Sequence, residues 1–168
     1  TDGTPAGTWV VSDIQPGAGN GMTLADAILP LDSTTALLIG YGGSGQQVWR
    51  TSGTLLNTSV VSTFATSPPP GLELLASTGT GRVLFAATTA NGRDLWGTNG
   101  TNAGTVMLVD DAGDEPKLLG KCNGAWLFTN RGPGLHDGGR LYRTNGTVAS
   151  TSLVATLPTG RISDADET

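Results

Sequence analysis

The chain has 168 residues, enough to build one ordinary hydrophobic core. Its 26 glycines and 9 prolines, with only 14% charged residues, disfavour helices and suit short strands joined by tight turns. The formal net charge of −5 and the scattered basic residues argue against a nucleic-acid partner. No apolar run approaches the roughly 20 residues that a membrane-spanning helix needs, and the one cysteine cannot form an internal disulfide.

One phrase recurs along the chain: an apolar residue, an aromatic residue, one variable residue, Thr-x-Gly-Thr, three variable residues and a further Thr. The Thr-x-Gly-Thr motifs begin at Thr1, Thr51, Thr98 and Thr144, which gives spacings of 50, 47 and 46 residues. A repeat of this period is typical of blades or arrays. We therefore interpret residues 1–168 as a single repeat array, with units at approximately 1–50, 51–97 and 98–143 and a partial unit at 144–168.

Each unit predicts four strands, taken here in chain order. A run of consecutive apolar residues follows the phrase and indicates burial on both faces; these runs are Thr8–Val11, Thr58–Val61, Thr105–Val109 and Thr151–Val154. A turn containing Pro or Gly leads to a short strand near 72–75 or 117–119. The most apolar strand comes next, at 36–39, 83–86 and 126–129, and a last strand ends at the recurring aromatic residue: Trp49, Trp96 or Tyr142.

The Thr-x-Gly-Thr motifs themselves contain hairpin signals. Asn99-Gly100 and Asn145-Gly146 are strong signals for a two-residue type I′ turn, in which both central residues have positive φ. Asp2-Gly3 fits this pattern equally well and Ser52-Gly53 fits it less well. The motifs therefore predict tight hairpins.

The predicted fold class is all-β: a β-propeller-type array of four-stranded antiparallel blades, with about three complete blades and loose terminal strands. Closed propellers need 4–8 blades, and open ends would leave apolar faces and strand edges exposed. We therefore expect another blade or chain to complete the array, either copies of this chain or further repeats of a longer parent chain. The alternative is a self-contained open solenoid of three blades. Because the sequence opens on Thr1, we expect a processed chain or a piece of a longer one.

The tandem phrase resembles a bacterial repeat family named for its consensus, ELWxxDGTxxGT. The stretch Asp94–Thr105 departs from that consensus only at Asp94 and Asn99, and the opening Thr1–Thr8 matches it throughout. Asp13–Gly17 extends the match, whereas other copies depart from it at Asn57 and Ser150. Members of the family are typically large surface or secreted proteins with propeller-like arrays. The resemblance implies such an architecture and an extracellular or cell-surface location, and it supplies no catalytic residues.

The densest acidic cluster suggests a site for a hard cation. Oxygen ligands suit Ca²⁺, and four carboxylates lie within six residues: Asp110, Asp111, Asp114 and Glu115. The order of these residues is not that of an EF-hand loop. The alternative is a solvated turn between blades, with no cofactor at all.

Two further features could bind a polar ligand. The longest connection between paired strands contains the only histidine, and enlarged loops on a regular scaffold often carry binding groups: here Arg131, His136, Asp137 and Arg140. Trp9 could stack on a sugar ring or on a partner, whereas its counterparts are Ser59, Val106 and Ser152. The alternatives are a tolerated surface insertion and burial of Trp9 against an adjoining blade.

The residues favour a non-catalytic extracellular module that makes structural or adhesive protein–protein contacts. Catalytic signatures are missing, since one His and one Cys make zinc and Cys-His chemistry improbable. The alternative is a lectin-like propeller that binds a glycan. A hydrolase is a distant third hypothesis.

Overall fold

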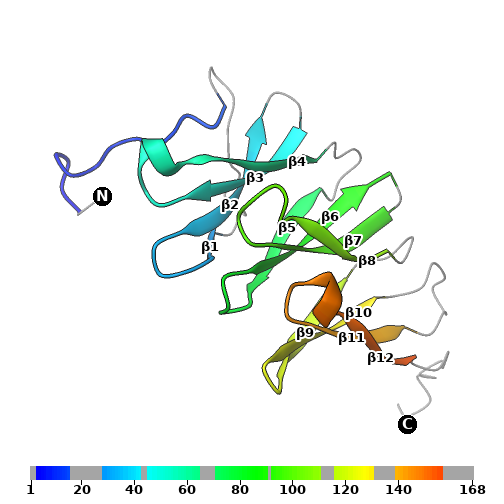
Figure 1. Ribbon diagram of the computed structural model, residues 1–168. Coiled ribbons are helices and arrows are strands. Elements are labelled where there is room, and N and C mark those ends of the chain that lie inside the picture. The colour runs from blue at the N-terminus through cyan, green and yellow to red at the C-terminus, as the bar shows by residue number, and fades with distance from the viewer. Residues whose placement is uncertain are drawn as a thin grey trace, which may run out of the picture.

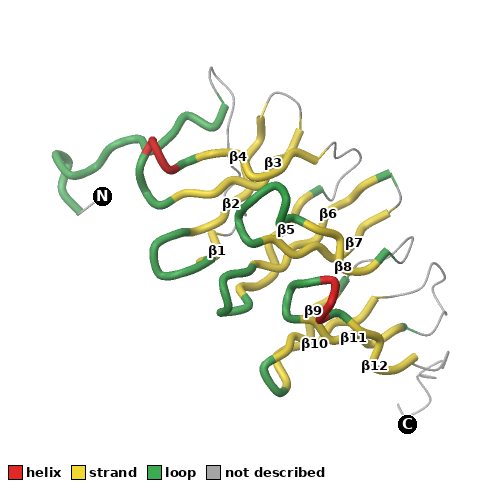
Figure 2. The backbone as a smooth tube through the Cα atoms, in the orientation of Figure 1, coloured by secondary structure: helices red, strands yellow, loops and turns green. Residues whose placement is uncertain are grey.

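The computed structural model describes residues 3–15, 28–42, 45–64, 71–90, 92–110, 116–130 and 139–156. These residues form an all-β fold of three four-stranded antiparallel sheets, which confirms the predicted class (Figure 1). In each sheet every strand pairs with its neighbour in the sequence. Figure 2 shows that the elements outside the strands are loops and two short helical turns, η1 (Leu55–Asn57) and η2 (Val148–Ser150).

The strands follow the repeat. The first sheet contains β1 (Ile28–Pro30), β2 (Ala36–Gly42), β3 (Gly45–Thr51) and β4 (Ser59–Phe64). The second contains β5 (Leu72–Ser77), β6 (Val83–Thr89), β7 (Gly92–Thr98) and β8 (Val106–Val109). The third contains β9 (Lys117–Cys122), β10 (Ala125–Asn130), β11 (Arg140–Thr144) and β12 (Ser152–Thr156). Each Thr-x-Gly-Thr motif that begins at Thr51, Thr98 or Thr144 joins the third strand of a sheet to the fourth, so the sheets are offset from the sequence units.

The three sheets lie in a row in chain order, with the first and third at opposite ends (Figure 1). One apolar cluster joins the first sheet to the second, where Phe64 meets the edge of Trp96 at a ring distance of 5.1 Å. Another joins the second sheet to the third around Leu84, Leu95 and Phe128. The second sheet is therefore buried on both faces.

The strands buried on both faces are the second strands of the first two sheets. Val83–Ala87 of β6 and Leu37–Gly40 of β2 are buried at every position. The runs after the phrase, which we expected to be buried on both sides, form the fourth strands β4, β8 and β12 instead. They lie at the sheet edges and stay partly exposed, because an edge strand has a neighbour on one side only.

The strand expected at Thr8–Val11 is not formed. Trp9 and Val10 are 63% and 81% exposed, and no strand of the described residues pairs with this segment. A strand needs a hydrogen-bonded neighbour, and β-rich composition alone does not supply one. The prediction at these residues was wrong for this reason.

The type I′ prediction was also wrong at three of its sites, including the weakest, Ser52-Gly53, where Gly53 has a φ of 81° and Ser52 does not have positive φ. Gly100 and Gly146 have positive φ values of 79° and 87°, but Asn99 and Asn145 do not have positive φ. Each motif is part of a longer loop that includes a further turn. Both central residues have positive φ at Asn123-Gly124, with values of 48° and 76°, where Cys122 pairs with Ala125 across a two-residue hairpin.

Candidate functional site

The threonines of the repeat form a chain of hydrogen bonds inside each loop that joins the third strand of a sheet to the fourth. In the second sheet the Gly100 N–H donates to Thr98 Oγ1 at 3.1 Å. Thr98 Oγ1 and Thr105 Oγ1 lie 2.8 Å apart, and the Thr105 hydroxyl donates to the Thr101 carbonyl at 2.8 Å. Because Thr105 has one hydroxyl proton, the bond between the two side chains is donated by Thr98. Each hydroxyl thus both accepts and donates.

The same chain is built in the other two sheets. The Oγ1 atoms of Thr51 and Thr58 are 2.7 Å apart, as are those of Thr144 and Thr151. In both loops the Thr-x-Gly glycine donates to the first threonine at 3.0 Å. The loop uses a Thr hydroxyl, a Gly backbone N–H and a second Thr hydroxyl at fixed positions as hydrogen-bond partners. This is why Thr, Gly and Thr recur at fixed spacing.

The turn of each later sheet docks on the sheet before it. Gly100 lies against the first sheet, where an added Cβ would come within 2.7 Å of Leu31 Cδ2. Gly146 lies against the second sheet: its carbonyl accepts from Arg82 Nη1 at 3.2 Å, and a Cβ on Gly97 would lie 2.5 Å from that same oxygen. The repeated glycine therefore permits both the turn and the close approach of neighbouring sheets.

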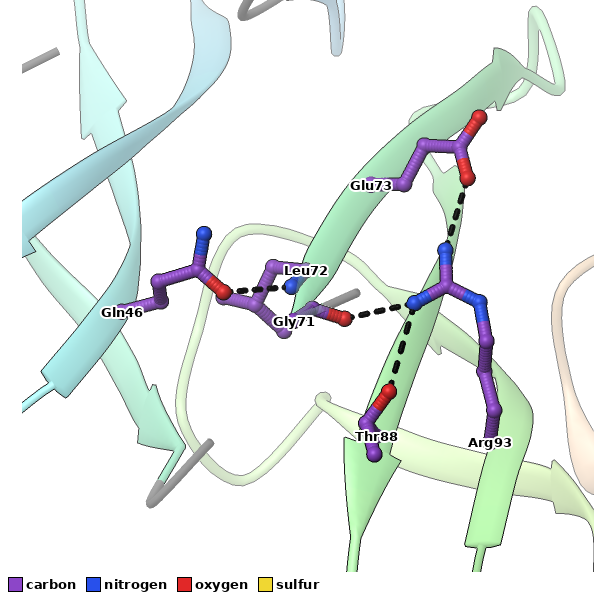
Figure 3. Close-up of polar contacts among 6 residues, drawn as sticks. All are labelled: Gln46, Gly71, Leu72, Glu73, Thr88 and Arg93. Carbon is purple, nitrogen blue, oxygen red and sulfur yellow. Dashed lines mark hydrogen bonds and ion pairs between the residues drawn. The ribbon is translucent and has the colours of Figure 1, made fainter. Parts of the chain in front are cut away.

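A polar contact ties the first sheet to the start of the second (Figure 3). Gln46 on β3 accepts a hydrogen bond from the Leu72 backbone N–H at 2.6 Å. On the other side, Arg93 on β7 donates to the Gly71 carbonyl and to Glu73 Oε2, each at 2.7 Å. The backbone that enters β5 is thus held between side chains from two sheets.

In the second and third sheets, one row of directly paired residues, one from each strand, faces the preceding sheet. In the second sheet this row is Leu74, Phe85, Trp96 and Met107, of which the first three belong to or pack against the cluster shared with the first sheet. Directly paired residues of antiparallel strands share a face. In the third sheet the row is Leu118, Phe128, Tyr142 and Leu153, and its first three members belong to or pack against the cluster shared with the second sheet.

The first sheet has an equivalent row, which we call the N-face row: Ile28, Leu38, Trp49 and Val60. All four residues are apolar, although this row points away from the second sheet. Its outer members Ile28 and Val60 are 59% and 41% exposed. No other sheet of the described residues covers this face, which makes it a candidate interaction surface.

The turn beside the N-face row differs from its counterparts. A Cβ on Gly53 would meet nothing within 4 Å, although its φ of 81° matches that of Gly100. Thr98 and Thr144 are fully buried, whereas Thr51 is half-buried. Leu56, in the same loop, is 96% exposed. The first turn therefore has the local structure of the others, but no sheet formed by the described residues precedes it.

The outer side of the third sheet is a second candidate surface, which we call the C-face. Two paired positions show the difference between the sheets: Ile39 and Val48 in the first sheet, and Ala86 and Leu95 in the second, are at most 1% exposed. Their counterparts Thr129 and Leu141 in the third sheet are only half-buried. No described sheet lies beyond them.

Of the four residues predicted in the ligand loop, the structure describes Arg140. Arg140 is exposed at the start of β11, opposite Asn130 and Thr156. Arg131, His136 and Asp137 lie outside the described residues. Trp9 is described and 63% exposed, so burial against an adjoining blade is not found among the described residues.

The acidic cluster is similarly only part described. Asp110 is exposed and directly follows β8, whereas Asp111, Asp114 and Glu115 lie outside the described residues. The described part of the chain contains no group of three His, Cys, Asp or Glu side chains placed to hold a metal ion. Nor does it contain a helix long and apolar enough to span a bilayer. The calcium site stays a prediction.

The chain matches no protein-family model, and no curated protein is similar to it.

Several contacts were not predicted from the sequence. Gln46 and Arg93 occupy the same register position in successive sheets, and each interacts with the strand start at 71–72. The signal available was a polar residue one position after the glycine that begins β3 and β7. A polar residue at the same position of two repeats can indicate a buried hydrogen bond.

Proposed function

We propose that the chain is a non-catalytic module of a β-propeller-type array, located outside the cell or at its surface, where it acts as a structural or adhesive scaffold. The observation that carries the proposal is the serial docking of repeats: the Gly100 and Gly146 turns each lie against the sheet before them. A repeat that docks on its neighbour in a constant way suits a scaffold that presents extended surfaces.

Further blades complete the array in this proposal, supplied by copies of this chain or by further repeats of a parent chain. The support is the distribution of exposed apolar side chains. Of the exposed large apolar residues among the described ones, Trp9 and Val10 lie in the N-terminal segment, and the others lie in the first or third sheet. None lies in the second sheet, which has a neighbour on each face.

Surface-located adhesion can be tested on the cells that produce the protein. Beads coated with the purified chain should attach to these cells, and protease treatment of intact cells should release peptides of the chain. Val60→Glu, which places a charge on the N-face row, should reduce attachment, whereas the exposed second-sheet variant Ala103→Glu should not. Chain protected from protease until lysis, together with no attachment, would contradict the proposal.

A second candidate is a lectin-like module, because two features would suit a sugar. Trp9 presents an exposed indole, and a hollow of about 510 Å³ in the first sheet is lined mainly by polar groups: Thr34, Thr35, Arg50, Ser52, Asn57 and Ser59, with Leu56 at its wall. Hydroxyl, amide and guanidinium groups are suitable partners for sugar hydroxyls. Saturable binding on a glycan array that is lost in Trp9→Ala or Asn57→Ala would favour this function, and an array without binding would remove it.

A further inference from the structure

The N-terminal segment repeats part of the phrase, and its contacts repeat as well. The Gly7 N–H donates to Thr4 Oγ1 at 3.0 Å, and the Thr8 hydroxyl donates to the Thr4 carbonyl at 2.7 Å. These are the contacts of Gly104, Thr101 and Thr105 in the second sheet. The segment is thus folded locally as the loop that precedes a fourth strand.

The residues after this loop lie over the first sheet. A Cβ on Gly40 would lie 2.6 Å from Ile14 Cγ2 and 2.9 Å from Trp49 Nε1, so Ile14 and Trp49 approach Gly40 on the same face. Ile14 comes six residues after Thr8, as Phe64 comes six residues after Thr58. Phe64, at the end of the fourth strand β4, packs against Trp96 in the next sheet. Ile14 therefore occupies the position relative to Trp49 that Phe64 occupies relative to Trp96.

The middle of the segment lacks the surroundings that its counterpart has. Trp9 and Val10 are 63% and 81% exposed and belong to no strand, although the equivalent residues Ser59 and Val60 lie in β4, paired with β3. In the loop between β3 and β4, a Cβ on Gly53 would meet nothing within 4 Å, and Leu56 is 96% exposed. The exposed residues Trp9, Val10 and Gly53, with Ile28 and Val60 of the N-face row, thus define the surface at this end of the row of sheets.

We propose that this surface binds a three-stranded antiparallel sheet of the same repeat, to which residues 9–14 add as the fourth strand. The new sheet would lie on the N-face row and would bring a face like that of Leu37, Ile39 and Val48 against Ile28, Trp49 and Val60. The interface continues the one between the first and second sheets, where the same two kinds of face meet. This inference rests on the proposed scaffold function. It adds to that function by naming the strands that continue the array at the N-face end.

The chain itself supplies a probe with the correct register. A second copy of residues 28–50 fused ahead of Thr1 places Arg50 before Thr1, as Arg50 precedes Thr51 in the native sequence. This extended full chain should slow amide exchange at Val10, Ile14 and Gly53 by about tenfold or more relative to the unextended chain, because the amides become part of a stable sheet or are covered by it. The matched control carries serine at the copied positions of Leu37, Ile39 and Val48 and should leave these rates unchanged.

Unchanged exchange in the extended chain, or equal protection with the control extension, would overturn the inference. A second variant keeps the test decisive if the extension does not fold. In the unextended chain, Ile14→Ser should speed amide exchange in β2 and β3 around Gly40 and Trp49, and unaltered exchange there would show that the segment does not follow the path of a fourth strand. If neither the extended chain nor Ile14→Ser gives the expected exchange rates while coated beads still attach to cells, this inference is rejected and the scaffold function is retained.

Discussion

Thr98 and Thr105 are seven residues apart and share a hydrogen bond of 2.8 Å between their Oγ1 atoms. Thr98 is fully buried, so its hydroxyl has no water to replace a lost partner. A buried polar group left without a partner destabilises a fold by roughly 1–3 kcal/mol. The pair is therefore one of the contacts through which the repeat phrase determines stability.

Thr98→Val should lower the free energy of unfolding by about 1–3 kcal/mol, because the Gly100 N–H and the Thr105 hydroxyl each lose a partner. Chemical denaturation followed by Trp fluorescence measures the change. Thr98→Ser keeps the hydroxyl and should cost less than Thr98→Val. Equal stability of the valine and serine variants would show that the hydrogen-bond chain contributes nothing.

Gly146→Ala and Gly53→Ala form a matched pair, because the two glycines have similar φ values of 87° and 81°. In both variants the alanine is destabilised by its positive φ. At position 146 the alanine Cβ would also lie 3.2 Å from Arg82 Cδ, whereas at position 53 it would meet nothing within 4 Å. We expect the loss in unfolding free energy to be larger for Gly146→Ala, with about 1–3 kcal/mol for the added crowding. A thermal or denaturant melt that ranks the two variants equally would contradict docking of the turn on the second sheet.

Glu73→Gln and Arg93→Met separate the two ends of the contact in Figure 3. Glu73 is 61% exposed, and a pair with one exposed partner contributes at most about 1 kcal/mol. Arg93 is 7% exposed and also donates to the Gly71 carbonyl, so its removal should cost more, roughly 1–3 kcal/mol. Unfolding curves of the two variants test this order, and a larger loss in Glu73→Gln would reverse the interpretation.

The pKa of the Asp32 carboxyl should lie below its ordinary value, chiefly because the Thr34 backbone N–H donates to it at 2.8 Å and also because the Thr34 hydroxyl donates at 2.9 Å. A lowered folded-state pKa stabilises the fold above the unfolded-state pKa, and this stabilisation is lost as pH falls through the folded-state pKa. NMR titration of the carboxyl measures the shift. Asp32→Asn should weaken the dependence of stability on pH below about pH 4, and an unchanged pH profile with an ordinary Asp32 pKa would contradict the contact.

Most strands and their order could be predicted from the sequence because the repeat is regular, the strand expected at Thr8–Val11 being the exception. The aromatic residue, the threonines and the following apolar run recur in each copy, and the structure places Trp49, Trp96 and Tyr142 at one register position of three sheets. Apolar runs such as 83–86 also predicted a strand correctly, although we expected burial on both faces for other runs. Periodicity identifies strands well when each copy repeats the evidence.

Contacts between sheets could not be predicted in the same way. Asn99-Gly100 favours a type I′ turn in isolation, but the hydroxyl of Thr98 and the first sheet near Leu31 stabilise another turn. Trp9 and Val10 have strand-forming side chains, yet a strand also needs a neighbour in the correct place. The first outcome depends on a side-chain hydrogen bond within the motif, and the second on residues distant in the sequence; the propensity of the dipeptide or the run alone contains neither.

Amide exchange at the three turn glycines tests most directly the central claim, that the Thr-x-Gly-Thr turns of the second and third sheets dock on the sheet before them. Gly53, Gly100 and Gly146 donate to equivalent threonines at 3.0–3.1 Å, so the local hydrogen bond is constant. We predict slow exchange at Gly100 and Gly146, which are buried against the sheet before them, and fast exchange at Gly53, which is exposed and would have nothing within 4 Å of an added Cβ. Equal exchange rates at all three glycines, measured by NMR on the native chain, would contradict serial docking of the sheets.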